Sequence, residues 1–190
     1  ADADFAARFT ALQSMKREQA ADVHADVAAI IEAVQTDGDD ALIALTAKFD
    51  RLDLTTTPMQ VSAAEIDAAE KACAPETRAA LDTAARRIAD FHARQKPDDN
   101  RFTDDAGVEL GHRWTPVDAA GLYVPGGLAN YPSSVLMNAL PARVAGVERV
   151  TMVVPTPDGV INPLVLAAAK RAGVDVIFRI GGAQAIAALA

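Results

Sequence analysis

Two glycine-rich turns with polar side chains beside them are the residues of this chain best suited to chemistry. The first turn, Pro125-Gly126-Gly127, follows Tyr123, and the second turn, Gly181-Gly182, precedes Gln184. Glycine has no Cβ and tolerates positive φ, so the backbone of such a turn can approach a ligand closely. A tyrosine ring can stack on a planar heterocycle, and a glutamine amide offers both a donor and an acceptor. These residue types are compatible with a site for a nucleotide-like ligand.

The same residues also have structural interpretations, and the sequence leaves both open. A helix is predicted to open near Pro132, with Ser133 and Ser134 close to its start, where free N–H groups and the helix dipole favour an anion. However, the first turn lacks the G-x-G-x-x-G spacing typical of dinucleotide-binding proteins. The turns are either a phosphate cradle or simple chain reversals. Likewise, Tyr123 is either a ligand contact or a half-buried sheet residue, and Gln184 is either a ligand contact or a helix cap.

The remaining reactive side chains form no catalytic or metal-binding constellation. The histidines lack the short spacings typical of zinc ligands, so no metal site is predicted within this chain. The single cysteine lies in an alanine-rich helical stretch and is predicted to be a buried structural thiol. The two carboxylate pairs suit helix caps and solvated loops better than acid–base catalysis. These residues are His24, His92, His112, Cys73, Asp39-Asp40 and Asp98-Asp99.

Both glycine turns belong to a strand–turn–helix pattern that occurs three times in succession. Alternation of short β-branched runs with helical segments predicts βαβ units and a parallel sheet, which binds ligands at the carboxyl ends of its strands. We therefore expect an α/β fold in which residues 119–190 form an incomplete, Rossmann-like parallel βαβαβα unit. The predicted strands are Gly121–Val124, Arg149–Val154 and Asp175–Ile180, with helices opening near Pro132, at Asn162-Pro163 and after Gly182.

Residues 1–96 are predicted to form a helical arm. Apolar residues at helical spacing predict one helix over 5–15 and a second over 23–34, which Gly38 ends. Asp39 or Asp40 is expected to cap the helix that follows. That next helix is expected to bury Leu42, Leu45 and Phe49.

The second half of the arm and the segment after it carry further local signals. The segment Ser62–Glu65 has capping-box spacing, so a helix is predicted to begin there. Pro75 suits the first turn of the helix after that. Residues 97–118 are predicted to form a hairpin connector, because the turn signal Asp104–Gly107 separates two strand-like runs. The apolar face of the helix after Pro75 consists of Leu81, Ala84, Ile88 and Phe91.

The composition excludes several classes of protein. A net charge of −8 and a pI near 4.8 argue against a nucleic-acid-binding surface, which needs clustered Lys and Arg. An apolar fraction of 51% and a mean hydropathy of +0.10 predict a globular chain. No apolar run reaches the roughly 18 residues of a membrane-spanning helix, and the N-terminus lacks the basic flank of a signal peptide. We therefore expect a cytoplasmic protein with no membrane or nucleic-acid partner.

Three long motifs resemble those of the histidinol dehydrogenase family in amino-acid sequence and in order along the chain. They are Gly121–Gly127, Asn130–Asn138 and Gly181–Ala190. This family catalyses the last two oxidations of histidine biosynthesis. The resemblance continues upstream to Gly38 and so covers nearly the whole chain. It implies that Tyr123 and Gln184 contact NAD. Gly126 and Gly127 join them as cofactor-binding candidates, because their turn lies between Tyr123 and a predicted helix N-terminus.

The resemblance implies a zinc- and NAD-dependent enzyme that oxidises L-histidinol through L-histidinal to L-histidine, reduces two NAD and forms a homodimer. The family's zinc ligands and its Glu/His acid–base pair lie downstream of the Gly-Gly-Ala-Gln helix, so we expect the metal-binding and catalytic residues beyond Ala190. The helical run at Ala190 also lacks a cap, which predicts the N-terminal part of a longer enzyme. We expect the 190-residue chain to be inactive by itself.

Two alternatives remain open from the sequence. A related dehydrogenase of the same family would oxidise another small alcohol, because the substrate-contacting residues are expected outside this segment. A non-catalytic fragment that binds a nucleotide or mediates association is the second alternative. A reading frame that continues past Ala190 into zinc-ligand and Glu-His motifs would favour the enzyme, whereas a stop codon would favour the fragment.

Overall fold

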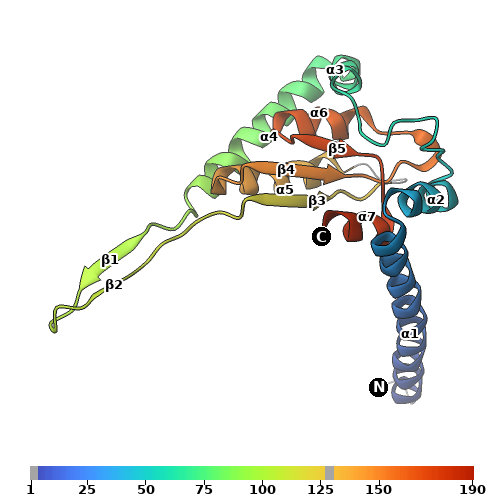
Figure 1. The fold of residues 1–190 in the computed structure, drawn as a ribbon, viewed down its shortest axis with the longest axis horizontal. Helices are drawn as coiled ribbons and strands as arrows, with labels where there is room; N and C mark the ends of the chain where they lie inside the picture. The colour runs from blue at the N-terminus through green and yellow to red at the C-terminus, as the bar shows by residue number, and fades with distance from the viewer. Residues whose placement is uncertain (1–3, 127–130) are drawn as a thin grey trace.

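The computed structural model describes residues 4–126 and 131–190, with the backbone alone over 14–22. Figure 1 shows a three-stranded sheet flanked by helices, from which a long N-terminal helix and a two-stranded hairpin project. The helices are α1 (Phe5–Asp37), α2 (Asp39–Asp50), α3 (Ala63–Ala72), α4 (Pro75–Ala93), α5 (Pro132–Ala145), α6 (Pro163–Arg171) and α7 (Gly182–Leu189), with a 3-10 turn η1 (Pro157–Gly159). The strands are β1 (Asn100–Thr103), β2 (Glu109–His112), β3 (Ala119–Tyr123), β4 (Arg149–Val153) and β5 (Val176–Phe178).

The predicted parallel sheet and its connecting helices are confirmed. Strands β3, β4 and β5 lie side by side in that order, and both pairs are parallel, with Ala119 opposite Arg149. Helices α5 and α6 connect the strands, and each begins with a proline, whose missing N–H is not needed at a helix start. Asn162 caps α6, because its Oδ1 accepts a hydrogen bond from the Leu164 N–H at 2.8 Å. This strand order is that of half a doubly wound dinucleotide-binding fold.

Two apolar layers enclose the sheet, because the side chains of a strand alternate between its faces. Val150, Met152 and Val154 pack into the layer formed with α5 and α6, and α3 and α4 pack outside these helices. Val153, which lies between them in sequence, packs into the opposite layer with α1, α2 and α7. The central strand β4 is therefore buried on both faces, as is usual in parallel sheets.

The N-terminal region differs from the sequence prediction in two respects. One continuous helix, α1, replaces the two predicted helices, because no glycine or proline interrupts residues 5–37 and their middle section is rich in helix-forming residues. Gly38, with φ of +57°, ends this helix as predicted. Asp39 and Asp40 are not caps, because Gly38 is the N-cap of α2 and both aspartates lie in the first turn. Their negative charges there complement the helix dipole.

The predicted apolar faces are correct except at their last aromatic residues. Leu42 is buried and Leu45 is half-buried, but Phe49 is 47% exposed because the last turn of α2 borders an open cleft. On α4, Leu81 is buried, whereas Phe91 is exposed and meets the neighbouring His92 ring edge-on.

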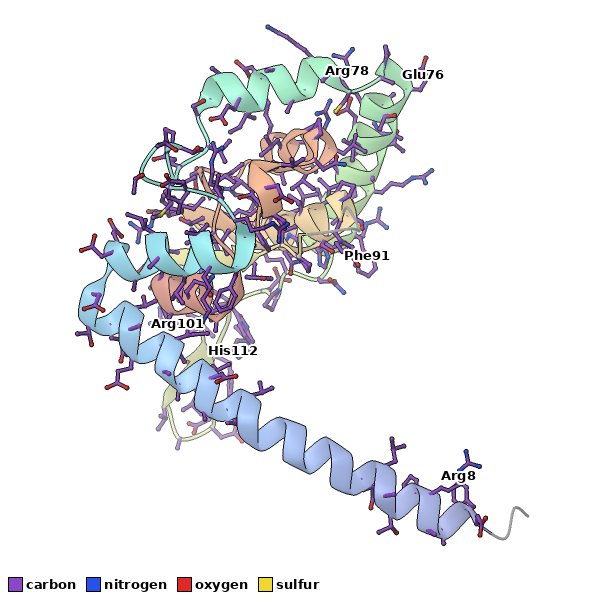
Figure 2. The ribbon with its side chains drawn as sticks, turned by 90° about the vertical axis from the view of Figure 1, so that its right-hand side faces the viewer. Arg8, Glu76, Arg78, Phe91, Arg101 and His112 are labelled. Atoms are coloured by element: carbon purple, nitrogen blue, oxygen red, sulfur yellow. The ribbon has the colours of Figure 1, made fainter. Side chains whose placement is uncertain are left out.

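The capping box and the hairpin are confirmed. The Ser62 hydroxyl accepts a hydrogen bond from the Glu65 N–H at 3.2 Å, and the Glu65 carboxylate accepts one from the Ser62 N–H at 2.9 Å. Strands β1 and β2 pair antiparallel around a turn in which Gly107 has φ of +84°. The hairpin extends away from the sheet (Figure 1), and Figure 2 shows Arg101 and His112 on it.

Candidate functional site

A cleft of about 460 Å³ opens where the three parallel strands end. Its volume is within the usual range of small-molecule sites, and open α/β sheets bind ligands at this edge. The cleft brings together three of the four predicted cofactor residues, Tyr123, Gly126 and Gln184, while Gly127 lies outside the described residues. The lining consists of Tyr123, Gly126, Pro155, Pro157 and Gly181–Gln184 from the strand ends, and of Val27, Ile30, Phe49 and Asp50 from α1 and α2.

Tyr123 connects two of the strand ends. It is the last residue of β3 and is half-buried. Its hydroxyl oxygen accepts a hydrogen bond from the Gly182 N–H at 3.2 Å, which joins the end of β3 to the first turn of α7. The side chain therefore has a structural role in the sheet and, at the same time, lines the cleft.

Gln184 is the most unusual polar residue of the cleft. Its side chain is 1% exposed, and its Oε1 has no hydrogen-bond partner among the described residues. It is not a helix cap, because Gly181 is the N-cap of α7 and no side chain caps this helix. An unpaired buried acceptor costs about 1–3 kcal/mol, so a donor supplied by a ligand would stabilise it. Gln184 is therefore a binding candidate in geometry as well as in residue type.

The glycines at the strand ends allow three loops to meet around Pro155. A Cβ on Gly126 would lie 2.4 Å from the Pro155 carbonyl oxygen, and one on Gly181 would lie 2.4 Å from the Pro155 Cβ. Gly182 has φ of +67°, and a Cβ there would lie 2.5 Å from the Gln184 Oε1. No other residue type fits these contacts without displacement, so the glycines allow the three loops to pack this closely.

An ion pair between a buried arginine and a half-exposed glutamate positions the approach to the second glycine turn. Arg179 follows β5 and is buried, and its Nη2 donates a hydrogen bond to the Glu65 Oε1 at 2.6 Å. Its backbone N–H donates to the Met59 carbonyl oxygen at 2.9 Å. The hydrogen bond from the Ser62 N–H, with a further contribution from Arg179, holds the pKa of Glu65 below its ordinary value. Sequence reasoning missed this pair, whose members are separated by 114 positions.

Asp50 is a cleft residue that sequence reasoning missed. It is the last residue of α2, and its Oδ2 accepts a hydrogen bond from the Thr156 N–H, just beyond β4, at 3.3 Å. No sequence signal linked α2 to the sheet edge, because these residues are 106 positions apart.

The other reactive side chains lie away from this cleft. Cys73 is buried as predicted, and its thiol donates to the Ala69 carbonyl oxygen at 3.2 Å. His24 is on α1, whereas His92 lines a separate pocket of about 270 Å³ with Lys96 and Trp114. Across residues 4–126 and 131–190, no group of three or more His, Cys, Asp or Glu side chains is placed to hold a metal ion. None of the described helices combines the length and hydropathy needed to cross a bilayer.

Comparison with known proteins gives consistent matches. The family model for histidinol dehydrogenase matches residues 13–190. Histidinol dehydrogenase of Cereibacter sphaeroides is 62% identical over 186 residues, which are 98% of this chain and 43% of that protein. Histidinol dehydrogenase of Rhodopseudomonas palustris is 61% identical over 190 residues, which are all of this chain and 44% of that protein. The chain thus spans less than half the length of these curated relatives.

A solved structure agrees with these sequence matches. The crystal structure of histidinol dehydrogenase from Elizabethkingia anophelis superposes with a TM-score of 0.83 at 37% sequence identity. The match covers 87% of this chain and 38% of that protein. The α/β architecture predicted from the sequence is therefore found in a solved relative.

Proposed function

The chain belongs to the histidinol dehydrogenase family, and we propose that it is the N-terminal part of an enzyme that oxidises L-histidinol to L-histidine with NAD as the hydride acceptor. Within this part of the enzyme, we assign the cleft at the strand ends to NAD. The observation that carries this assignment is the buried Gln184 Oε1, which lacks a donor among the described residues, in a residue that lines the same cleft as Tyr123. The family match does not favour the two alternatives that the sequence left open.

The groups that line the cleft suit different parts of a dinucleotide. The Tyr123 ring suits stacking on a planar heterocycle, and the Gln184 Oε1 suits a hydroxyl or amide donor. Helix α7 begins at Gly182, whose N–H is bonded to Tyr123, and the dipole of its N-terminus favours a diphosphate. Gly126 lines the cleft and packs closely against Pro155, and Gly127 stays a cofactor-binding proposal from the sequence. Bound NAD would accept the hydride, while these residues bind and orient it.

The other family properties are proposals for the longer enzyme. We propose that zinc is held by residues outside this chain, because the resemblance places the ligands downstream and the described residues offer no suitable cluster. We also propose a homodimer in the cytoplasm, with catalytic Glu and His residues outside this chain. Family membership supports each of these properties.

Removal of either side chain proposed to contact the cofactor is expected to weaken the binding of NAD more than the binding of histidinol. In the full-length enzyme, Tyr123→Ala or Gln184→Ala should raise the apparent KM for NAD several-fold, because each removes a contact worth about 1 kcal/mol. Steady-state NADH production with both substrates varied measures this effect. Gln35→Ala, which changes an exposed glutamine on α1, is the matched control and should leave both KM values unchanged. An unchanged KM for NAD in folded Tyr123 and Gln184 variants would contradict the assignment.

A further inference from the structure

Asp50 is a buried carboxylate that accepts one hydrogen bond from the described residues. It is 7% exposed and occupies the last position of α2, where the helix dipole disfavours a negative charge. One oxygen accepts a long hydrogen bond of 3.3 Å from the Thr156 N–H. The hydroxyls of Thr46 and Thr156, both fully buried, bond to no described group, so neither serves the carboxylate. In the part of the chain that the structure describes, the other carboxylate oxygen has no donor, and Asp50 lines the cleft.

The position of this carboxylate in the fold indicates which group of a nucleotide it contacts. In doubly wound dinucleotide-binding folds, an acidic side chain beyond the glycine turn, at the end of the second strand, accepts a hydrogen bond from the ribose 2′-hydroxyl. Here β4 is the second strand of the sheet, and the first acidic residue after it, Asp158, has both carboxylate oxygens bonded to Arg51. Asp50 lies at this strand end through its bond to the Thr156 N–H, although it comes from α2.

The neighbouring cation is already engaged. Arg51 follows Asp50 directly, and its Nε and Nη2 donate to the two carboxylate oxygens of Asp158 at 2.7 and 2.6 Å. An arginine near this position is what proteins use to accept a ribose 2′-phosphate. Because Asp158 occupies the Nε and Nη2 donors of this guanidinium, the strand end presents an acceptor, Asp50, and the described lining of the cleft contains no Lys or Arg.

We propose that Asp50 accepts a hydrogen bond from the 2′-hydroxyl of the adenosine ribose and thereby selects NAD over NADP, an inference that rests on the nucleotide site proposed above. The hydroxyl supplies the donor that the free carboxylate oxygen lacks. A 2′-phosphate at the same point offers no donor at neutral pH and places a second negative charge against the carboxylate. The residue therefore determines specificity at the ribose and takes no part in hydride transfer.

Ligand-observed NMR titration with NAD⁺ and NADP⁺ tests this role, because it measures dissociation constants into the millimolar range. The native protein is expected to bind NAD⁺ about tenfold or more tightly than NADP⁺. In Asp50→Asn, the affinity for NAD⁺ should fall roughly tenfold, and the dissociation constants of the two nucleotides should differ by about threefold or less. Asp39→Asn removes the same charge from the exposed first turn of the same helix and should behave as the native protein.

The outcomes separate this inference from the site on which it rests. If the native protein binds neither nucleotide, or if Tyr123→Ala binds NAD⁺ as tightly as the native protein, the assignment of the nucleotide site is wrong. The inference about Asp50 is then wrong as well. If Tyr123→Ala weakens NAD⁺ but Asp50→Asn keeps the native preference, only the ribose assignment is overturned. If Asp50→Asn fails to fold, the binding of the 2′-deoxyadenosine analogue of NAD⁺ to the native protein tests the proposal instead. This analogue is expected to bind about tenfold more weakly than NAD⁺, and equal binding overturns the proposal.

Discussion

Glu65→Ala is expected to lower the free energy of unfolding by about 3 kcal/mol, because it leaves the Arg179 guanidinium buried without its partner. The Arg179 Nε already lacks a hydrogen-bond partner among the described residues, so the remaining polar contacts are few. Solvent reaches the half-exposed Glu65 side chain, which keeps the effect at the lower end of the range for broken buried pairs. The substitution also removes the capping box of α3. Chemical denaturation followed by circular dichroism measures the loss.

Two control variants identify the cause of this loss. Arg179→Met removes the charge instead of leaving it unpaired, so it should cost less than Glu65→Ala. Glu65→Gln keeps an acceptor for the Ser62 N–H and should also cost less. Because the folded protein holds the pKa of Glu65 below its ordinary value, the carboxylate stabilises the fold above the unfolded-state pKa. This contribution is lost as the pH falls through the lowered folded-state pKa, and Glu65→Gln should remove that part of the acid sensitivity. A greater loss in Arg179→Met than in Glu65→Ala would refute the explanation.

Gly181→Ala is expected to destabilise the protein by about 2–3 kcal/mol through crowding alone. The φ of Gly181 is −139°, which any residue adopts, so backbone strain does not contribute. The added methyl group would lie 2.4 Å from the Cβ and 2.7 Å from the Cγ of Pro155, a rigid ring that cannot rotate away. The loop after β5 would have to move away from the loop after β4. Thermal unfolding monitored by circular dichroism measures the effect.

A second-site substitution distinguishes crowding from other causes. In a Pro155→Gly background, which lacks the Cβ and Cγ that collide, Gly181→Ala should cost less than half as much. Gly146→Ala is the matched control for backbone strain, because Gly146 has φ of +100° while a Cβ there would lie an ordinary 3.5 Å from the Pro116 Cγ. It should cost about 1 kcal/mol in both backgrounds. Equal costs of Gly181→Ala with and without Pro155 would show that the contact with this ring is unimportant.

The parts of the fold that the sequence predicted correctly are those specified by neighbouring residues. The helix predicted to open at Asn162-Pro163 does so, with Asn162 as its cap, and the predicted turn at Asp104–Gly107 forms, with Gly107 at positive φ. The capping box between Ser62 and Glu65 spans three residues. In each case the stabilising contact lies within one turn of the chain, so residue type and spacing are sufficient to predict it.

The features that the sequence did not predict depend on contacts between distant segments. Arg179 meets Glu65 and Asp50 meets Thr156 only after α2 and α3 have packed beside the sheet. Phe49 has the helical spacing of a core residue, yet it lies exposed at the border of the cleft. A departure from local apolar patterning at a cleft is typical of functional sites, because the open space there serves a ligand and not the core.

The central claim is that the cleft at the carboxyl ends of β3, β4 and β5 binds the dinucleotide, and a crystal structure of the protein grown with saturating NAD⁺ tests it most directly. We predict that the nucleotide lies in this cleft, with polar atoms within about 3.2 Å of the Gln184 amide and a ring close to Tyr123. NAD⁺ bound in the separate pocket lined by His92, Lys96 and Trp114, with the strand-end cleft empty, would contradict the account.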